Sequence, residues 1–292
     1  SKPRRYGALE LIQTVVDPGS WVGWDGPPAE VAAPGSAYAA ELAEAAIRSG
    51  TDEAIITGEA TLKGRRIAVV AGEFRFLAGS IGVVAAERIV LAFERAQREG
   101  LPVFAAPSSG GTRMQEGTLA FLGMVKISAA VSAFKEAGLP YVVYLRHPTT
   151  GGVFASWGSL GHVTVAEPGA LVGFLGPRVF EALYGHPFPE GVQTSENLHE
   201  HGLIDAVLPV EGLRDIAHTT LNLLVAPREE HPEVFELPRE PLPDIPAWES
   251  ITRSRRAERP SVRALLKLGA TDVIPLHGTN QGEYDPALML AL

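Results

Sequence analysis

The chain has 292 residues, 46% of them hydrophobic and 20% charged, so it can bury one large core or two small ones. Its formal net charge of −9 argues against general nucleic-acid binding and against docking on an anionic membrane surface, but not against a local basic pocket. The absence of cysteine excludes disulfides, thiol nucleophiles, thiolate zinc sites and iron–sulfur clusters.

Neither a leader nor a membrane span is expected from the apolar runs. The start, SKPRRYGALELIQ, lacks the long apolar core of a signal peptide, and no apolar run reaches the ~20 residues of a membrane helix. The expectation is therefore a soluble, cytoplasmic protein.

Composition divides the chain into three regions. Residues 1–50 form a helical lead-in, with the amphipathic stretch ALELIQTVV and the helical pattern AYAAELAEAAIRSG, which ends on Gly50. Residues 51–225 alternate apolar strand-like runs with helical patterns. Residues 226–292 open with a linker dominated by proline and glutamate, after which SVRALLKLG resumes helical spacing.

The middle region contains a weak internal repeat. REGLPVFAA (98–106) ends one helical pattern and begins a strand, and EAGLPYVVY (136–144) does the same 38 residues later. Gly100 and Gly138 suit the positions just past a helix, and the following prolines stop it. Short, continuously apolar strands separated by helices predict an α/β fold with a mainly parallel, buried sheet.

Two Gly-Gly pairs follow two of these strands. Gly110 and Gly111 lie in PSSGGTRMQEG after VFAAP, and Gly151 and Gly152 lie in HPTTGGVFASWG after YVVYL. Each pair thus comes just past the carboxyl end of a strand and just before a helical pattern, where α/β sheets bind ligands. Amides at a helix start lack internal partners and favour negative charge, so they can hold an oxyanion. A tight turn or a close packing contact is the competing explanation for each pair.

The sequence offers no evident catalytic side chain. GxSxG, HExxH and phosphate-loop motifs are all missing. His199 and His201 stand two residues apart and would not share a helix face, so no metal site is predicted. Glu116 and Glu167 are candidate general bases, although Glu116 is better explained by a place in a first helical turn. Oxyanion donors without a base suggest that substrate or cofactor supplies the base.

Four segments together resemble the β subunit of bacterial acetyl-CoA carboxylase carboxyltransferase, a member of the crotonase superfamily. They are GEFRFLAGSIGVVAAERI, SSGGTRMQEG, HPTTGGVFASWGSLGHVTVAEPGALVGFLGPRV and FPEGVQTSENLHEHGLIDAVL, which occur in the family's order between about 53 and 210. The resemblance implies a crotonase/ClpP-like spiral of repeated β-β-α units. It also implies transfer of a carboxyl group from carboxybiotin to the α-carbon of acetyl-CoA or a short acyl-CoA, giving malonyl-CoA for fatty acid biosynthesis.

The resemblance also assigns site residues. Gly151 and Gly152 match the pair whose amides hold the thioester enolate, and Gly110 and Gly111 match the neighbouring loop of the site. The residues matched to acyl-CoA binding are Phe74, Phe76, Gly79, Ser80, Arg113 and Thr150. Arg65, Arg66, Arg75 and Lys126 are candidates to attract CoA phosphates, with a solvated surface charge as the commoner explanation.

The sequence departs from the family's β subunit at both ends. The four-cysteine zinc ribbon is absent, so no metal is expected. PAWESITRSRRAERPSVRALLKL and IPLHGTNQGEYDPALML resemble the beginning of the α subunit, with Thr279 and Asn280 departing from its usual text. These features predict a fused β–α polypeptide cut early in α, or a relative that keeps a docking segment.

The implied partners are an α-type subunit or fused half, which would hold carboxybiotin, and a biotin carboxyl carrier protein, in an oligomer of β–α pairs. No nucleic-acid or membrane partner is expected. Two alternatives remain: a stand-alone crotonase-type acyl-CoA lyase or decarboxylase, and a non-catalytic assembly subunit. Phe154 and Trp157 are bulky for their positions, which favours a short or unusual acyl group unless Trp157 belongs to the core.

Overall fold

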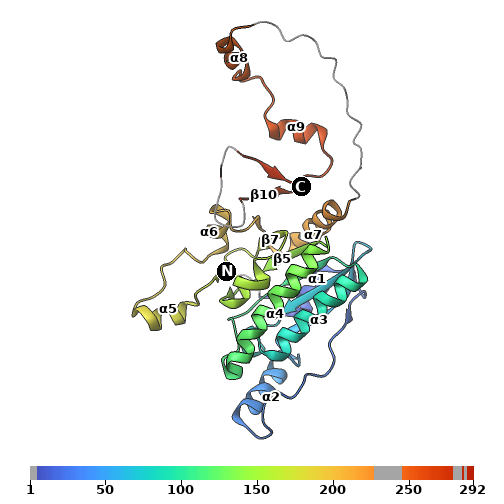
Figure 1. The fold of residues 1–292 in the computed structure, drawn as a ribbon, viewed down its shortest axis with the longest axis vertical. Helices are drawn as coiled ribbons and strands as arrows, with labels where there is room; N and C mark the ends of the chain where they lie inside the picture. The colour runs from blue at the N-terminus through green and yellow to red at the C-terminus, as the bar shows by residue number, and fades with distance from the viewer. Residues whose placement is uncertain (1–4, 227–244, 279–284, 286–287) are drawn as a thin grey trace. The chain divides into compact units, whose positions relative to one another are not determined.

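The centre of the fold is a mixed sheet in the order β1-β2-β3-β4-β5-β7-β9, in a computed structural model that describes residues 5–226, 245–278, 285 and 288–292 (Figure 1). The strands are β1 (Val22–Gly23), β2 (Ile55–Leu62), β3 (Arg65–Gly72), β4 (Val103–Ala106), β5 (Tyr141–Leu145), β7 (Val163–Ala166) and β9 (Ala206–Val207). β1, β2 and β3 pair antiparallel, and all pairs from β3 to β9 are parallel. The predicted mainly parallel sheet is confirmed.

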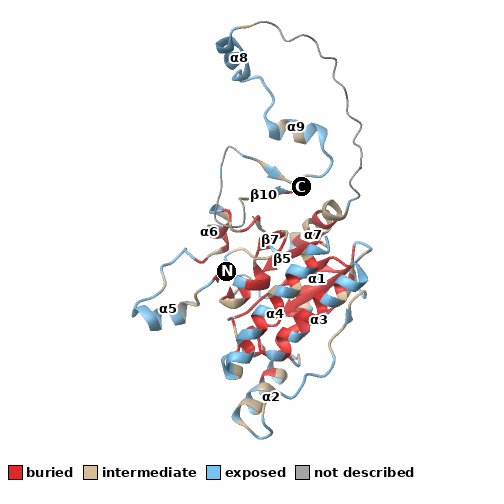
Figure 2. Cartoon of the chain, in the orientation of Figure 1, coloured by how far each residue is buried: buried red, intermediate tan, exposed pale blue. Residues whose placement is uncertain are grey.

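Helices cover both faces of this sheet, because its inner strands are apolar at consecutive positions. Val103 and Ala105 of β4 pack into the core beneath α3 and α4, whereas Phe104 packs on the opposite side beneath α1 and α7. Figure 2 shows the buried strands between these helices. The helices are α1 (Ala8–Val15), α2 (Ala37–Ser49), α3 (Val83–Glu99), α4 (Gly117–Glu136), α5 (Pro177–Tyr184), α6 (Ser195–Glu200), α7 (Val210–Val225), α8 (Ala247–Ser254) and α9 (Val262–Gly269).

A repeating unit generates the fold. Each unit gives a strand to the large sheet, then a short extended segment to a second layer, then a helix. After β5 comes β6 (Thr149–Thr150), and after β7 comes β8 (Val172–Gly173), which pairs parallel with β6. After β4, Ser109 bridges Thr149 in the same layer. In these units the chain passes from the large sheet to the second layer at the carboxyl ends of β4, β5 and β7. Both Gly-Gly pairs lie at such crossings.

The local predictions for the repeat hold. The strands predicted at VFAA and YVVYL are β4 and β5, and they are parallel neighbours. Gly100 ends α3 in the left-handed conformation, at φ +64°. The helices predicted at ALELIQTVV, AYAAELAEAAIRSG and SVRALLKLG are α1, α2 and α9.

The chain forms two compact units. One consists of Ser1–Val225 with Pro275–Leu292, and the other of Ala226–Ile274. In the first unit, β10 (Pro275–Leu276) pairs with β11 (Leu290–Ala291), and the carboxylate of Asp205 accepts a hydrogen bond from the backbone of His277. The second unit contains α8 and α9. Most of the predicted proline-rich linker lies outside the described residues, and the three-part domain division stays a prediction.

One helical stretch in the described part of the chain, Met114–Glu136, is long and apolar enough to cross a membrane. No apolar run in the sequence marks this stretch, because charged residues such as Lys126 interrupt it. A single stretch of this kind is weak evidence for a membrane span, since the core helix of a soluble protein has the same character. Here one side of α4 packs against α3, and Ile127, Val131 and Phe134 are buried in the shared core.

Candidate active site

Three loops meet where the chain crosses between the two sheet layers. They are the loop after β3, with η1 (Leu77–Gly79), the Gly110–Gly111 loop after β4 and the Gly151–Gly152 loop after β5. A Cβ built on Gly151 would lie 3.7 Å from the Cα of Gly111, so the two glycine pairs are in contact. The structure thus brings together both pairs predicted from the sequence.

The N–H groups of the four glycines differ in their hydrogen-bond acceptors. Gly110 N–H donates to the carbonyl of Ala78 at 2.9 Å, Gly111 N–H to Ser109 Oγ at 3.0 Å, and Gly151 N–H to the carbonyl of Gly173 at 3.0 Å. Gly152 begins the helical turn that leads into η3 (Phe154–Gly158), and its N–H has no hydrogen-bond acceptor among the described residues. Gly152 is therefore the amide best placed to receive an oxyanion from outside.

The two glycines of the second pair are required for different reasons. Gly151 has φ +64°, a left-handed conformation that costs other residues energy because of their Cβ. Gly152 has no such conformation, but a Cβ there would lie 3.3 Å from Met124 Cγ and 3.4 Å from Thr112 Oγ1. Gly151 therefore shapes the turn, while Gly152, which has no Cβ, leaves unfilled the narrow space beside Met124 and Thr112.

Arg113 is fully buried, and its guanidinium is directed at protein groups rather than at open space. Nη1 donates to Glu53 Oε2 at 3.0 Å, and Nη2 donates to the carbonyl of Ser80 at 2.7 Å. Burial alone would lower the pKa of Arg113, but the hydrogen bonds and charge of Glu53 outweigh it and raise that pKa. Arg113 therefore holds the loop, and its assignment to acyl-CoA binding stays a prediction.

The remaining predicted binding residues are spread over different surroundings. Gly79 packs tightly under the Gly110 loop, since a Cβ on it would lie 2.1 Å from the carbonyl of Ser108. Thr150 is buried, with Oγ1 3.4 Å from the carbonyl of Ser109. Phe76 is buried beside Ala45 and Ala54, so its ring is not open to a substrate.

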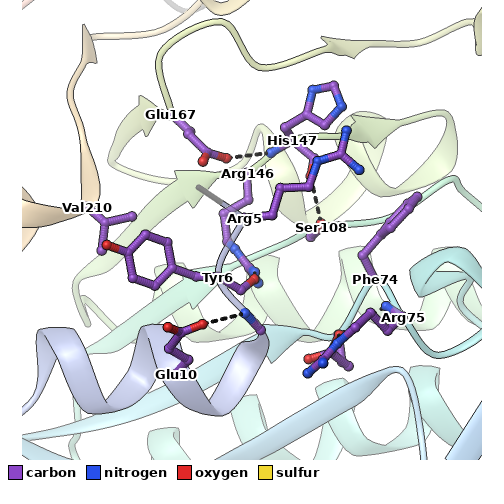
Figure 3. Close-up of a pocket in the computed structure, with 12 residues that line it drawn as sticks. Arg5, Tyr6, Glu10, Phe74, Arg75, Ser108, Arg146, His147, Glu167 and Val210 are labelled. Atoms are coloured by element: carbon purple, nitrogen blue, oxygen red, sulfur yellow. Dashed lines mark hydrogen bonds and ion pairs between the residues drawn. The ribbon is translucent and has the colours of Figure 1, made fainter. Parts of the chain in front are cut away.

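Phe74 lines a separate cavity of about 230 Å³, shown in Figure 3. The cavity also contains Arg146 and Glu167, at the carboxyl ends of β5 and β7. The buried guanidinium of Arg146 donates to the carbonyl of Gly72 at 2.7 Å and to that of Tyr6, and burial lowers its pKa. The Arg146 guanidinium therefore links the N-terminal segment to the sheet.

The candidate cations for CoA phosphates all have protein partners. Arg66 contacts Glu59 and Glu99, Arg65 contacts Asn222, Arg75 contacts Glu73, and Lys126 contacts Glu87.

The two candidate bases also have hydrogen-bond partners within the protein. Glu116 accepts a hydrogen bond from the backbone of Val83 at the start of α3, and Glu167 accepts one from the backbone of His147. Glu116 lies in the first turn of η2 (Met114–Glu116), as predicted, and its side chain caps the start of α3.

Sequence reasoning missed Tyr38. Its hydroxyl donates to Glu116 Oε1 and lies 3.5 Å from Arg113 Nη1, so a residue of the N-terminal region reaches the loop of the first glycine pair. No local motif marks this contact, because 78 residues separate its two ends. Trp157 is fully buried, as its core interpretation required.

These features agree with the comparisons with known proteins. The carboxyl transferase domain matches residues 5–290. The chain belongs to the carboxyl transferase family. It is 58% identical over 282 residues to the probable biotin-dependent acyl-coenzyme A carboxylase beta3 subunit of Mycobacterium tuberculosis, covering 96% of this chain and 56% of that protein. It is 44% identical over 188 residues to the acetyl-coenzyme A carboxylase carboxyl transferase subunit beta of Sinorhizobium medicae, covering 64% and 62%.

Solved structures place this carboxyl transferase chain in the crotonase fold. The transcarboxylase 12S core superposes with a TM-score of 0.65 at 22% identity, covering 75% of this chain and 42% of that one. A chain of the Pseudomonas malonate decarboxylase MdcD–MdcE hetero-dimer gives 0.59 at 23% identity, covering 75% and 86%. The predicted crotonase-like α/β spiral is confirmed. The chain spans about half the length of the mycobacterial relative. Among the described residues, no group of three or more His, Cys, Asp or Glu could hold a metal ion.

Proposed function

We propose that the chain forms the acyl-CoA half of a biotin-dependent carboxyltransferase, which moves a carboxyl group from carboxybiotin to the α-carbon of acetyl-CoA or another short acyl-CoA. The observation that carries this proposal is the Gly152 amide, which stands at a helix start beside the first glycine pair and has no acceptor in the described chain. The identity with a relative named as a biotin-dependent acyl-CoA carboxylase subunit supports it.

The proposed chemistry depends on the atom of the thioester that becomes negatively charged. Removing the α-proton of a thioester puts negative charge on its carbonyl oxygen, and the Gly152 N–H, with the positive end of the helix behind it, would stabilise that charge. Loss of one such donor costs on the order of 10²–10³ in rate. Carboxybiotin, carried by a separate protein, would supply the carboxyl group and, after losing it, the base.

A base supplied by the substrate agrees with the state of the carboxylates. Glu116 is committed to the backbone of Val83, and Glu167 to the backbone of His147 at 2.9 Å. Both carboxylates therefore hold backbone around the site. The role left to this chain is to bind and orient the thioester.

Packing beside Gly152 supports a short acyl group. Met124 and Thr112 narrow the space on one side, and Phe154 is buried in the same helical turn. One methylene is worth only about 1–3 kcal/mol of discrimination, so acetyl and propionyl groups would be separated modestly.

An exposed apolar face on α4 supports a partner. Met124 contacts the Gly152 position from this helix, and nearby Leu119, Phe121, Leu122 and Val125 are each more than half exposed. Contiguous apolar surface of this kind marks an interaction site. We propose that a second carboxyltransferase half, fused or separate, covers this face and brings carboxybiotin to the thioester. Such pairs would form the oligomer.

The test uses purified chain, labelled acetyl-CoA and a carboxylated biotin carrier, with and without an α-type half. Transfer is expected only when both halves are present, because alignment of two reactants supplies roughly 10⁵–10⁸ M in effective concentration. Transfer by the chain alone would contradict the split site. Breakdown of malonyl-CoA without biotin would favour a decarboxylase, and failure to bind any acyl-CoA would favour an assembly subunit.

A charge on the α4 face tests the partner separately. Phe121→Asp should weaken association with the α-type half, as measured by sedimentation, while acyl-CoA binding persists. Leu91→Asp is the matched control, because Leu91 is also about half exposed but lies on α3. Equal association of both variants would contradict docking at α4. Cytoplasmic location and supply of malonyl-CoA for fatty acid synthesis belong to the same proposal and rest on the family resemblance.

A further inference from the structure

A buried ionic network lies beneath the Gly110–Gly111 loop. Its centre is Arg113, whose guanidinium contacts Glu53 through both terminal nitrogens and Glu116 Oε1 at 3.3 Å. The side chains of Glu53 and Glu116 are only 3% and 5% exposed. Two carboxylates, one guanidinium and the hydroxyl of Tyr38 therefore share a site with little water, where each contact is stronger than at the surface.

The four members of this network come from three separate segments. Tyr38 lies in the first turn of α2, and Glu53 precedes β2. Arg113 directly precedes the short helical turn η2 (Met114–Glu116), and Glu116 is its last residue. Arg113 also donates to the carbonyl and hydroxyl oxygens of Ser80, just past η1. A single guanidinium thus ties the loop after β3 to the loop after β4.

Backbone contacts carry this constraint to the glycines. Ile81 N–H donates to the carbonyl of Gly111, and Arg113 N–H donates to the carbonyl of Ile81, both at 2.9 Å. Gly110 N–H donates to the carbonyl of Ala78 in the same pair of loops. The Gly111–Thr112 segment, which faces Gly151 and Gly152, is therefore positioned by hydrogen bonds on both sides of it.

Glu116 adds a third attachment point, at α3. One of its oxygens accepts from Tyr38, and the other accepts from the backbone of Val83 at the start of α3. Gly82 leaves room for the carboxylate, since a Cβ at that position would lie 2.4 Å from Glu116 Oε1. Arg113, Tyr38 and the first amide of α3 thus fix Glu116 from three directions.

We propose that Tyr38, Glu53, Arg113 and Glu116 form a positioning network, which holds the Gly110–Thr112 loop at the distance from Gly152 that carboxyl transfer needs. This inference rests on the proposed function. It makes catalysis depend on Tyr38, a residue of α2 whose hydroxyl contacts Glu116 and Arg113. All four are positioning residues, because each acts through the backbone of the two loops.

Tyr38→Phe is the mildest test, since it removes one hydroxyl and leaves no buried charge unpaired. In the assembled carboxylase, kcat should fall by roughly 5- to 10-fold, the equivalent of one hydrogen bond, while KM for acyl-CoA changes little. Arg113→Lys should lower kcat further, because an ammonium cannot make the forked contacts to Glu53 and Ser80. Hydrogen exchange should accelerate in residues 77–82 and 109–117 of both variants.

The matched control is Tyr144→Phe. Its hydroxyl donates to the carbonyl of Leu208, in the core on the other side of the sheet, so the change removes a comparable hydrogen bond away from the loops. This variant should lose some stability and keep its kcat. If Tyr38→Phe kept the wild-type kcat in an active enzyme, the positioning role would be wrong while the proposed function stood. An assembled wild-type enzyme without carboxyl transfer would contradict both.

Discussion

The two glycine pairs look alike in sequence and differ in the folded chain. Both follow an apolar parallel strand, and both precede a helical turn. The amides of Gly110 and Gly111 are committed to Ala78 and Ser109, whereas Gly152 N–H has no acceptor in the described part of the chain. The first pair is held in place as a wall of the site, and the second presents a donor. We propose that the repeated motif serves structure in its first copy and chemistry in its second.

Among the substitutions at the two glycine pairs, Gly152→Val should cause the largest loss of transfer activity. Its branched side chain would crowd Met124 and Thr112 and block approach to the amide, so transfer should fall by more than about 10²-fold. Activity in the assembled enzyme measures this. Gly23→Val is the control, because Gly23 lies on edge strand β1 with nothing within 4 Å. Full activity of Gly152→Val would remove the basis for the oxyanion assignment.

Gly151→Ala separates backbone shape from donor space. The left-handed φ of +64° should make the substitution cost roughly 1–2 kcal/mol in free energy of unfolding. The urea midpoint measures the loss, and Gly23→Ala should leave it nearly unchanged. A Gly151→Ala protein as stable as wild type would show that the turn does not depend on this conformation.

Gly110→Ala tests the structural role of the first glycine pair. A Cβ there would lie 3.5 Å from the carbonyl of Ala78, an ordinary contact, and the N–H stays bound to that carbonyl. We expect transfer to fall by roughly threefold or less, corresponding to a small free-energy change. A loss as large as that of Gly152→Val would show that both pairs act on the reacting oxygen.

The smallest expected effect is a pH dependence at the base of the second loop. Burial lowers the pKa of His147, and Arg5 acts in the same direction against Glu167. The neutral ring accepts a hydrogen bond from Leu171 N–H at Nδ1. Since the unfolded chain binds this proton more readily, stability is full above pH about 6.5 and declines as pH falls toward the folded pKa.

His147→Asn tests this assignment, because an amide oxygen can replace Nδ1 as the acceptor without titrating. The urea midpoint of the variant should fall less steeply between about pH 7 and pH 5 than that of the wild type. Some slope should remain, since burial and Lys135 also lower the pKa of His162. An unchanged slope would exclude His147 as a source of the acid sensitivity.

The parallel α/β architecture and the position of both glycine pairs could be predicted from residue patterns, and the family from the resemblance of four segments. Continuous apolar strands such as YVVYL can be stable only when buried on both faces, and glycine after such a strand permits a turn that other residues resist. These are local physical requirements, so they can be read along the chain.

The availability of the Gly152 amide and the contacts of Arg113 could not be predicted in this way, because both depend on how distant segments pack. The partner of Gly110 comes from the preceding β-β-α unit and that of Gly151 from the following one, and Arg113 meets Glu53 across 60 residues. Hydrogen bonds of this kind depend on how the loops come into register after the crossover helices pack. Residue type and spacing do not determine that register. They also do not determine the burial of Arg113, which directs its guanidinium into the protein.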